Sequence, residues 1–239
     1  MTTEPQDLHF LHVSKTGGTA VREALADHHD GDNFRLVMHR HQVTLKSVAV
    51  GDAVVLFLRD PITRFASAFA SRQRRGQPRH NHPNTEAEVQ AFARFATPNE
   101  LANALSSSTS ASRSDAEEAM RGINHVRIHY ADWFHGHDYF LSRQDDLFFI
   151  GFQESLAQDF DLLRTKLGLP TEVRLPQDPV AAHRRPADQP HVLDAQAVHN
   201  LQSWYADDLA FFELCRSISA DINARPWTNS SAGPNLLDG

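Results

Sequence analysis

Residues 15–19 (Lys-Thr-Gly-Gly-Thr) have the composition of an anion-binding turn. They follow an apolar run over residues 8–13, which predicts a buried strand, and lead into a helical pattern over residues 19–27. Glycines let a ligand approach the backbone, and the unpaired amides and dipole at a helix start favour negative charge. The lysine adds positive charge, and the threonines add hydroxyl donors. Because the lysine precedes the glycine pair, this is not a Walker sequence, and magnesium-dependent nucleotide hydrolysis fits less well. The candidate binding residues are Lys15, Thr16, Gly17, Gly18 and Thr19.

A second polar group follows the most apolar run of the chain. Residues 53–58 (Ala-Val-Val-Leu-Phe-Leu) predict a central parallel strand, and Arg59 comes directly after it, at the edge where ligands bind in open α/β sheets. The Asp-Pro dipeptide that follows predicts the start of a helix to about residue 74. Ser67 lies about 9 Å along this helix. The Arg59 guanidinium and the Ser67 hydroxyl can therefore meet on one phosphate.

Other side chains on the helices are expected to be structural. Arg64 is expected to hold its helix to a neighbouring carboxylate. Phe65 and Phe69 lie four residues apart on one helix face and are expected to pack on the sheet. An aromatic stripe near the C-terminus is more typical of a core than of a ligand site; it consists of Trp204, Tyr205, Phe211 and Phe212.

Apolar runs alternate with helical patterns along the chain, which indicates an α/β fold. Residues 147–151 predict a further strand, followed by a helix over about 155–167, and a last long helix is expected over about 194–217. We therefore expect a P-loop-like three-layer fold in which helices flank a central, mainly parallel sheet. Residues 228–239 are expected to form a frayed tail.

We expect the whole chain of 239 residues to form a single domain with one insertion. The insertion covers about residues 72–140 and is expected to be mostly helix and loop. Helical patterns over residues 86–105 and 114–121 are separated by a serine-rich run at 106–112, which is interpreted as an exposed loop. An insertion beside an α/β core is a usual place for acceptor recognition.

Composition excludes several classes of function. The net charge of −7 and the pI near 6.1 argue against a nucleic-acid binder, whose binding surface is basic. The single Cys215 forms no internal disulfide and offers no cysteine metal cage. The polar N-terminus lacks the features of a signal peptide, and no run of 18 apolar residues predicts a membrane span. A cytoplasmic protein is expected.

Histidine pairs spaced as His-x-His invite a metal interpretation. With 15 histidines in the chain some such spacings arise by chance, and no nearby carboxylate cluster completes a first coordination shell. We therefore expect no metal. The last pair is also a fallback candidate for acceptor binding or for the base. The pairs are His39 and His41, His80 and His82, and His135 and His137.

Two motifs in order resemble the cofactor motifs of sulfotransferases: a strand, Lys-Thr-Gly-Gly-Thr and a helix, then an apolar strand and Arg-Asp-Pro-x-x-Arg-Phe-x-Ser-x-Phe. The chain is most similar to the carbohydrate type, which includes the heparan sulfate and uronyl 2-O-sulfotransferases. Residues 148–160 resemble the family's strand-then-helix segment, and residues 204–212 resemble its C-terminal Tyr-x-x-Asp-x-x-x-Phe helix. The likeness covers most of residues 8–212, apart from the insertion.

The resemblance implies 3′-phosphoadenosine 5′-phosphosulfate (PAPS) as the sulfate donor, 3′,5′-adenosine bisphosphate (PAP) as a product and no metal. Residues 15–19 would hold the 5′-phosphosulfate. Arg59 and Ser67 would hold the 3′-phosphate. Arg184 and Arg185 lie where the family has a loop that closes over the nucleotide, so either can also reach a phosphate.

The 2-O-sulfotransferases that the chain resembles carry His-Gly-His in the position of His39-Arg40-His41, and a histidine there serves as the base. Arg40 replaces the glycine, so the local backbone differs. An acceptor hydroxyl must lose its proton as it attacks sulfur, and histidine suits that task near neutral pH. On a strand, alternation would point one histidine into the cleft and the other away. The choice between His39 and His41 stays open.

The expected activity is sulfuryl transfer from PAPS to a hydroxyl acceptor, a carbohydrate or glycoconjugate, by in-line displacement. Positioning and electrostatics would dominate, with Lys15 stabilising the leaving phosphate. One alternative is an ATP-dependent phosphotransferase that uses the same turn. Another is a non-catalytic module that binds a nucleotide or glycan. The identity of the acceptor and the oligomeric state stay open.

Overall fold

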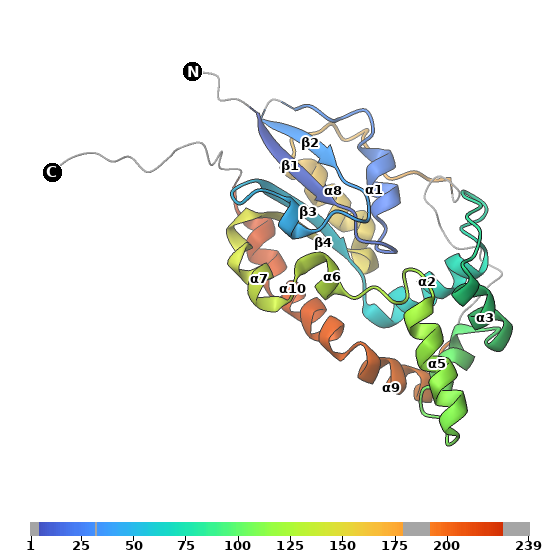
Figure 1. The fold of residues 1–239 in the computed structure, drawn as a ribbon. Helices are drawn as coiled ribbons and strands as arrows, with labels where there is room; N and C mark the ends of the chain where they lie inside the picture. Colours follow the sequence, from blue (N-terminus) through green and yellow to red (C-terminus); the bar gives the residue numbers. More distant parts are fainter. Residues whose placement is uncertain (1–4, 32, 179–191, 227–239) are drawn as a thin grey trace.

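The computed structural model of the protein describes residues 5–31, 33–178 and 192–226 (Figure 1). At its centre is a four-stranded sheet with the strand order β2-β1-β3-β4, in which all three neighbouring pairs are parallel. This confirms the expected α/β fold with a parallel central sheet. The strands are β1 (Gln6–Leu11), β2 (Phe34–Met38), β3 (Ala53–Leu58) and β4 (Leu147–Phe152).

Helices cover both faces of the sheet, which makes three layers (Figure 1). Strand β3 is buried along its whole length because alternate side chains enter different cores. Val55 and Phe57 pack with α1 (Gly18–Ala24) and α8 (Leu156–Lys166) on one face. Val54, Leu56 and Leu58 pack on the opposite face, against α6 (Tyr130–Phe134), α7 (His137–Ser142) and α10 (Ala206–Ala224).

A separate helical layer lies beyond the carboxyl edge of the sheet. Phe65 and Phe69 pack into the core of this layer, so the expectation that they pack on the sheet is wrong. Their helix extends away from the strands towards the insertion (Figure 1). The helices are α2 (Pro61–Gln73), α3 (Glu86–Arg94), α4 (Pro98–Ala104), α5 (Ser110–Gly122) and α9 (Ala195–Trp204). Short 3-10 turns complete the fold at Leu45–Ser47, Gln144–Asp146 and Gln153–Ser155.

Several helix boundaries differ from those expected. The pattern over 86–105 is divided between α3 and α4, because Thr97 caps a new helix whose first residue is proline. Helix α5 begins at Ser110, inside the serine-rich run that was interpreted as loop. The expected last helix is also two helices, α9 and α10, which break at Tyr205. Tyr205 is buried, and its hydroxyl donates to the Val126 carbonyl at 2.8 Å.

Among the described residues, no helix combines the length and the apolar character that a membrane span requires.

Candidate active site

A cavity of about 1090 Å³ lies beyond the carboxyl ends of β1 and β3. Most of the residues predicted for the site line it: Lys15, Gly17, Gly18, Thr19, His41, Arg59 and Ser67. Thr16 and His39 are not in its wall. Arg184 and Arg185 lie outside the described residues. The structure therefore brings both sequence motifs together around one cavity.

The turn after β1 has the backbone geometry of an anion-binding site. Lys15 and Gly17 adopt positive φ angles of 68° and 87°, and α1 starts at Gly18 without a side-chain cap on its amides. A Cβ at Gly17 would lie 2.9 Å from Leu156 Cδ2, and one at Gly18 would lie 2.5 Å from His12 Cδ2. Any larger residue would therefore clash at both glycines. The uncapped amides at the helix start are available to a negatively charged ligand.

The Lys15 ammonium lies in a crowded, positively charged environment. Burial lowers the pKa of Lys15 to about 7, and the nearby Arg74 and Arg59 add to the shift. The negative charge of a bound polyanion would offset this shift and favour the charged form of Lys15. The lysine is thus suited to take up a proton when an anion enters the cavity.

Thr16 does not act as the sequence analysis predicts for its hydroxyl. The side chain is buried, and Oγ1 donates to the Val13 carbonyl at 3.0 Å. Because its single proton is used inside the turn, the hydroxyl cannot also donate to a phosphate oxygen. Only the backbone amide of Thr16 remains for a ligand, whereas the Thr19 side chain lies in the cavity wall.

Arg59 and Ser67 reach the cavity from the end of β3 and from α2. Arg59 Nε donates to Thr63 Oγ1 at 3.0 Å, and Arg59 Nη1 lies 3.5 Å from the Lys15 carbonyl oxygen. The helix start is fixed as expected, because the Thr63 amide donates to the Asp60 carboxylate at 2.8 Å. Arg59 of the second motif therefore lies next to the anion-binding turn that contains Lys15.

Arg64 is structural, but its expected carboxylate partner is wrong. The buried guanidinium donates to three backbone carbonyls, of Ser14 at 3.2 Å, His125 at 3.3 Å and Ile128 at 2.8 Å. No carboxylate of the described residues lies within ion-pair distance. Residues 125–128 pass next to Arg64, and the several N–H donors of its planar guanidinium fit the carbonyls of this segment. Arg64 thereby joins the anion-binding turn to a distant segment.

Replacing Arg64 with methionine is expected to lower the free energy of unfolding by about 3 kcal/mol or more, because it leaves three carbonyls without their donor. Urea denaturation would measure this loss. Arg113→Met is the matched control, since Arg113 is an exposed arginine on α5, and its loss is expected to cost less than about 0.5 kcal/mol. Equal effects of the two substitutions would contradict the structural role of Arg64.

His41 faces the cavity in a form that can accept a proton. The segment lies just after β2, and His41 Nδ1 is 2.7 Å from the His12 carbonyl oxygen. Because a carbonyl only accepts, Nδ1 carries the proton and the lone pair is on Nε2. Burial lowers the pKa of His41 from its ordinary value, this hydrogen bond partly opposes the shift, and Arg22 and Lys15 lower it further. The imidazole is therefore neutral near neutral pH.

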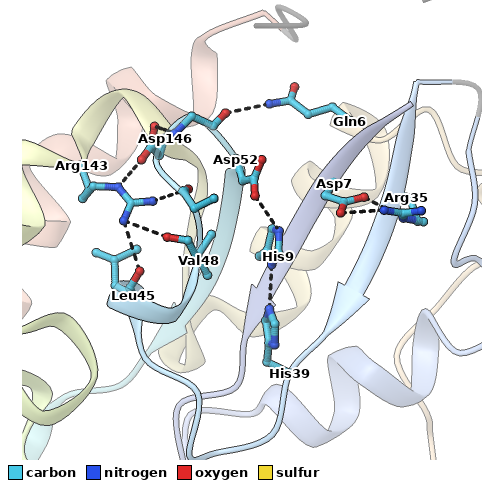
Figure 2. Close-up of polar contacts among 12 residues, drawn as sticks. Gln6, Asp7, His9, Arg35, His39, Leu45, Val48, Asp52, Arg143 and Asp146 are labelled. Carbon is cyan, nitrogen blue, oxygen red and sulfur yellow. Dashed lines mark hydrogen bonds and ion pairs between the residues drawn. The ribbon is translucent and has the colours of Figure 1, made fainter. Parts of the chain in front are cut away.

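His39 takes part in a different group of side chains. Its Nε2 lies 2.8 Å from His9 Nδ1, with the two rings stacked, and His9 Nε2 is 3.3 Å from Asp52 Oδ2 (Figure 2). These residues form a row that crosses β1 at His9, and His39 lies outside the cavity wall. Of the two candidate bases, His41 is the one that lines the cavity.

A second cavity of about 630 Å³ adjoins the first. His41, His125 and Arg72 line both cavities and so mark their junction. Arg72 is held there by a buried, bidentate ion pair with Glu88, at 2.7 and 2.8 Å. The remaining lining is mostly polar: Gln42, Thr44, Asn124, Arg127, Ile128, Asp132 and Trp133. The junction gives His41 access to two ligands, one in each cavity.

A group of residues that holds the site in place was not predicted from the sequence. Arg22 Nη1 donates to the His39 carbonyl at 2.8 Å and lies 3.3 Å from His12 Nδ1. Burial, followed by the nearby His41 and Arg22, lowers the pKa of His12 to about 2, so His12 is neutral. The position of His12 next to the glycine turn was a signal for its role. Arg22 and His125 carry no signal in the sequence.

The other two histidine pairs lie in different parts of the structure. His80 and His82 line the main cavity, whereas His135 and His137 line neither cavity. Within the described part of the chain, no three His, Cys, Asp or Glu side chains are grouped so that they could hold a metal ion.

The comparisons with known proteins agree with this geometry. A model of the sulfotransferase family matches residues 1–214 of the 239. No curated protein and no solved structure matches the chain significantly. The family match covers both sequence motifs, the whole sheet and the walls of the two cavities. The chain therefore belongs to the sulfotransferase family, whose general activity is the transfer of a sulfuryl group.

Proposed function

We propose that the protein transfers the sulfuryl group of PAPS to a hydroxyl of a carbohydrate or glycoconjugate. The observation that carries this proposal is that two basic groups line one cavity with a neutral histidine at its edge. The donor carries two separate anionic groups, the 5′-phosphosulfate and the 3′-phosphate. A site for a single phosphate would need only one of the two basic groups.

The turn after β1 and the start of the second motif would each bind one of the two anionic groups of the donor. Lys15 and the amides of residues 16–19 bind the 5′-phosphosulfate at the helix start. Arg59 and Ser67 bind the 3′-phosphate, because both line the same cavity from the second motif. The family resemblance also assigns Arg184 and Arg185, which lie outside the described residues, to a phosphate of the donor.

The chemistry then follows from the position of His41. Its Nε2 accepts the proton of the acceptor hydroxyl as the oxygen attacks sulfur. The bond between sulfur and the 5′-phosphate oxygen breaks, and Lys15 with the turn amides stabilises the charge on the departing oxygen. The products are a sulfate ester and PAP.

The second cavity favours an acceptor that carries many hydroxyl groups. Its wall offers amide, hydroxyl, guanidinium and carboxylate groups, which together both donate and accept hydrogen bonds. Sugars present hydroxyls that need both kinds of partner. The carbohydrate class also rests on the resemblance of the two motifs to carbohydrate sulfotransferases.

Thermal unfolding with added nucleotides tests the proposed donor. PAP at a hundred times its Kd is expected to stabilise the protein by about 2.7 kcal/mol, since it binds only the native state. Mg-ATP is expected to have a much smaller effect. Stabilisation by Mg-ATP and not by PAP would instead indicate a phosphotransferase.

Turnover is tested with radiolabelled PAPS and a panel of neutral and uronic-acid-containing oligosaccharides. Label in at least one oligosaccharide is the expected result. PAP binding without label in any acceptor would favour the non-catalytic module.

A further inference from the structure

Two buried polar atoms in the wall of the main cavity have no hydrogen-bond partner among the described residues. They are the Ser14 hydroxyl and His125 Nδ1. Ser14 is only 1% exposed, so bulk water does not satisfy its hydroxyl. Buried polar side chains are nearly always hydrogen-bonded, and an exception on a cavity wall points to a ligand. Neither residue has a role in the donor site described above.

Ser14 and His125 are held in place by the same guanidinium. Arg64 Nε donates to the Ser14 carbonyl, and Arg64 Nη2 donates to the His125 carbonyl. His125 also adopts a positive φ of 65°, which few residues with a side chain adopt. A conformation of this kind persists only where surrounding contacts impose it. The two residues, 111 positions apart in the sequence, are thus fixed together at the cavity.

The positions of Ser14 and His125 indicate that they contact the sulfuryl group. Ser14 directly precedes Lys15 in the turn, and His125 lies with His41 at the junction of the two cavities. Burial lowers the pKa of His125 to about 3, and the nearby Lys15 and His41 contribute. His125 therefore stays neutral while His41 is the better proton acceptor. A neutral imidazole can donate one hydrogen bond and keep its proton throughout the reaction.

We propose that Ser14 and His125 bind the oxygens of the sulfuryl group at the junction of the two cavities. This inference rests on the proposed function, because it assigns the sulfuryl end of the same donor. The Ser14 hydroxyl and the His125 Nδ1–H each donate to a sulfuryl oxygen. During transfer the sulfur exchanges its bond to the phosphate oxygen for a bond to the acceptor oxygen, and His41 takes the acceptor proton.

The chemistry of the two groups fits a sulfuryl rather than a phosphoryl group. A terminal sulfuryl group carries one negative charge over three oxygens, whereas a terminal phosphoryl group carries close to two near pH 7. Two uncharged donors complement the weaker charge. A terminal phosphoryl group is usually met by cations and a metal ion. Ser14 and His125 would thus help the site select PAPS over ATP.

Calorimetric titration with PAP and with PAPS tests this inference, because only PAPS carries the sulfuryl group. Ser14→Ala and His125→Gly are each expected to weaken PAPS binding about tenfold, since each removes a hydrogen bond to a charged group. Their affinity for PAP is expected to stay within about twofold of the wild-type value. Glycine is chosen for position 125 because it tolerates the positive φ.

Conservative and distant variants serve as controls. His125→Asn also tolerates the positive φ and keeps an amide donor near the place of Nδ1, so it is expected to retain most PAPS affinity. Ser203→Ala and His199→Asn make the same chemical changes on the exposed face of α9 and are expected to leave both affinities unchanged. Thermal unfolding verifies the fold of each variant. Ser14→Ala is expected to be at least as stable as the wild type, because it removes an unpartnered hydroxyl.

Three other results of the titrations would overturn the inference. An equal loss of PAP and PAPS affinity would overturn the inference, because the residues would then support the donor site as a whole. Unchanged affinity for both ligands would overturn it as well, while the proposed function would stand. Failure of the wild-type protein to bind PAP or PAPS would overturn the proposed function itself, and the inference with it.

Discussion

His41→Asn is expected to lower kcat for sulfuryl transfer by about 10³-fold while PAP affinity changes less than about twofold. The asparagine amide can still donate to the His12 carbonyl, which now accepts from His41 Nδ1 at 2.7 Å, so the segment keeps its position. The variant lacks only the lone pair of Nε2. Single-turnover kinetics with radiolabelled PAPS measures the rate, and calorimetry measures the PAP affinity.

His39→Asn is the matched control, because His39 pairs with His9 outside the cavity wall. We expect it to change kcat by less than about fivefold. The pH profile gives a second readout, since the base must be neutral. Burial lowers the pKa of His41, so activity should persist at and somewhat below pH 6.5, histidine's ordinary value, and fall at lower pH as the ring becomes protonated. A larger loss in His39→Asn than in His41→Asn would contradict the assignment.

Lys15→Met is expected to lower kcat by about 10³-fold and to weaken PAP binding by about 100-fold. The lysine lies in the turn beside the helix start, and Arg59 approaches the carbonyl of the same residue. Methionine keeps much of the aliphatic chain but removes the charge that would stabilise the departing phosphate oxygen. Steady-state kinetics and calorimetric titration measure the two effects. An unchanged kcat would place the leaving oxygen elsewhere.

The same lysine should make PAP binding depend on pH. The free protein has a Lys15 pKa of about 7, and a bound polyanion is expected to raise it. Little proton uptake is then expected well below pH 7, where the lysine is already charged. Above pH 7, binding should take up close to one proton and weaken as the pH rises. Calorimetry in two buffers of different ionisation enthalpy measures the uptake. Lys15→Arg keeps a permanent charge and is expected to abolish it.

The central sheet was predictable where its strands are buried on both faces. Residues 53–58 form a continuous apolar run, and β3 occupies that range. The edge strand β2 (Phe34–Met38) was not predicted, because it is short and carries the exposed Arg35. The break at Tyr205 was also missed. At the break, the Tyr205 hydroxyl donates to the carbonyl of Val126, which lies 79 residues away and which no local pattern encodes.

The candidate site was predictable where a local sequence pattern determines the backbone. Lys15 and the two glycines of its turn line the cavity, as their position between a strand and a helix indicates. The use of the Thr16 hydroxyl could not be inferred although its partner is local, because the sequence alone does not decide whether the hydroxyl donates to the Val13 carbonyl or to a ligand oxygen. His125 reaches the junction through the fold of the insertion and its hydrogen bond to Arg64. Contacts of this kind depend on tertiary structure alone.

Because His12 packs on Gly18, a substitution at one of these two positions limits which residues the other can accept. A Cβ at position 18 would lie 2.5 Å from Cδ2 and 2.9 Å from Nε2 of the imidazole, so even alanine overlaps the ring. A smaller residue at position 12 would relieve the overlap but would lose the ring nitrogen beside Arg22. We expect related sequences to change positions 12 and 18 together, and to replace Arg22 when they do. Engineered libraries of this turn should therefore vary all three positions at once.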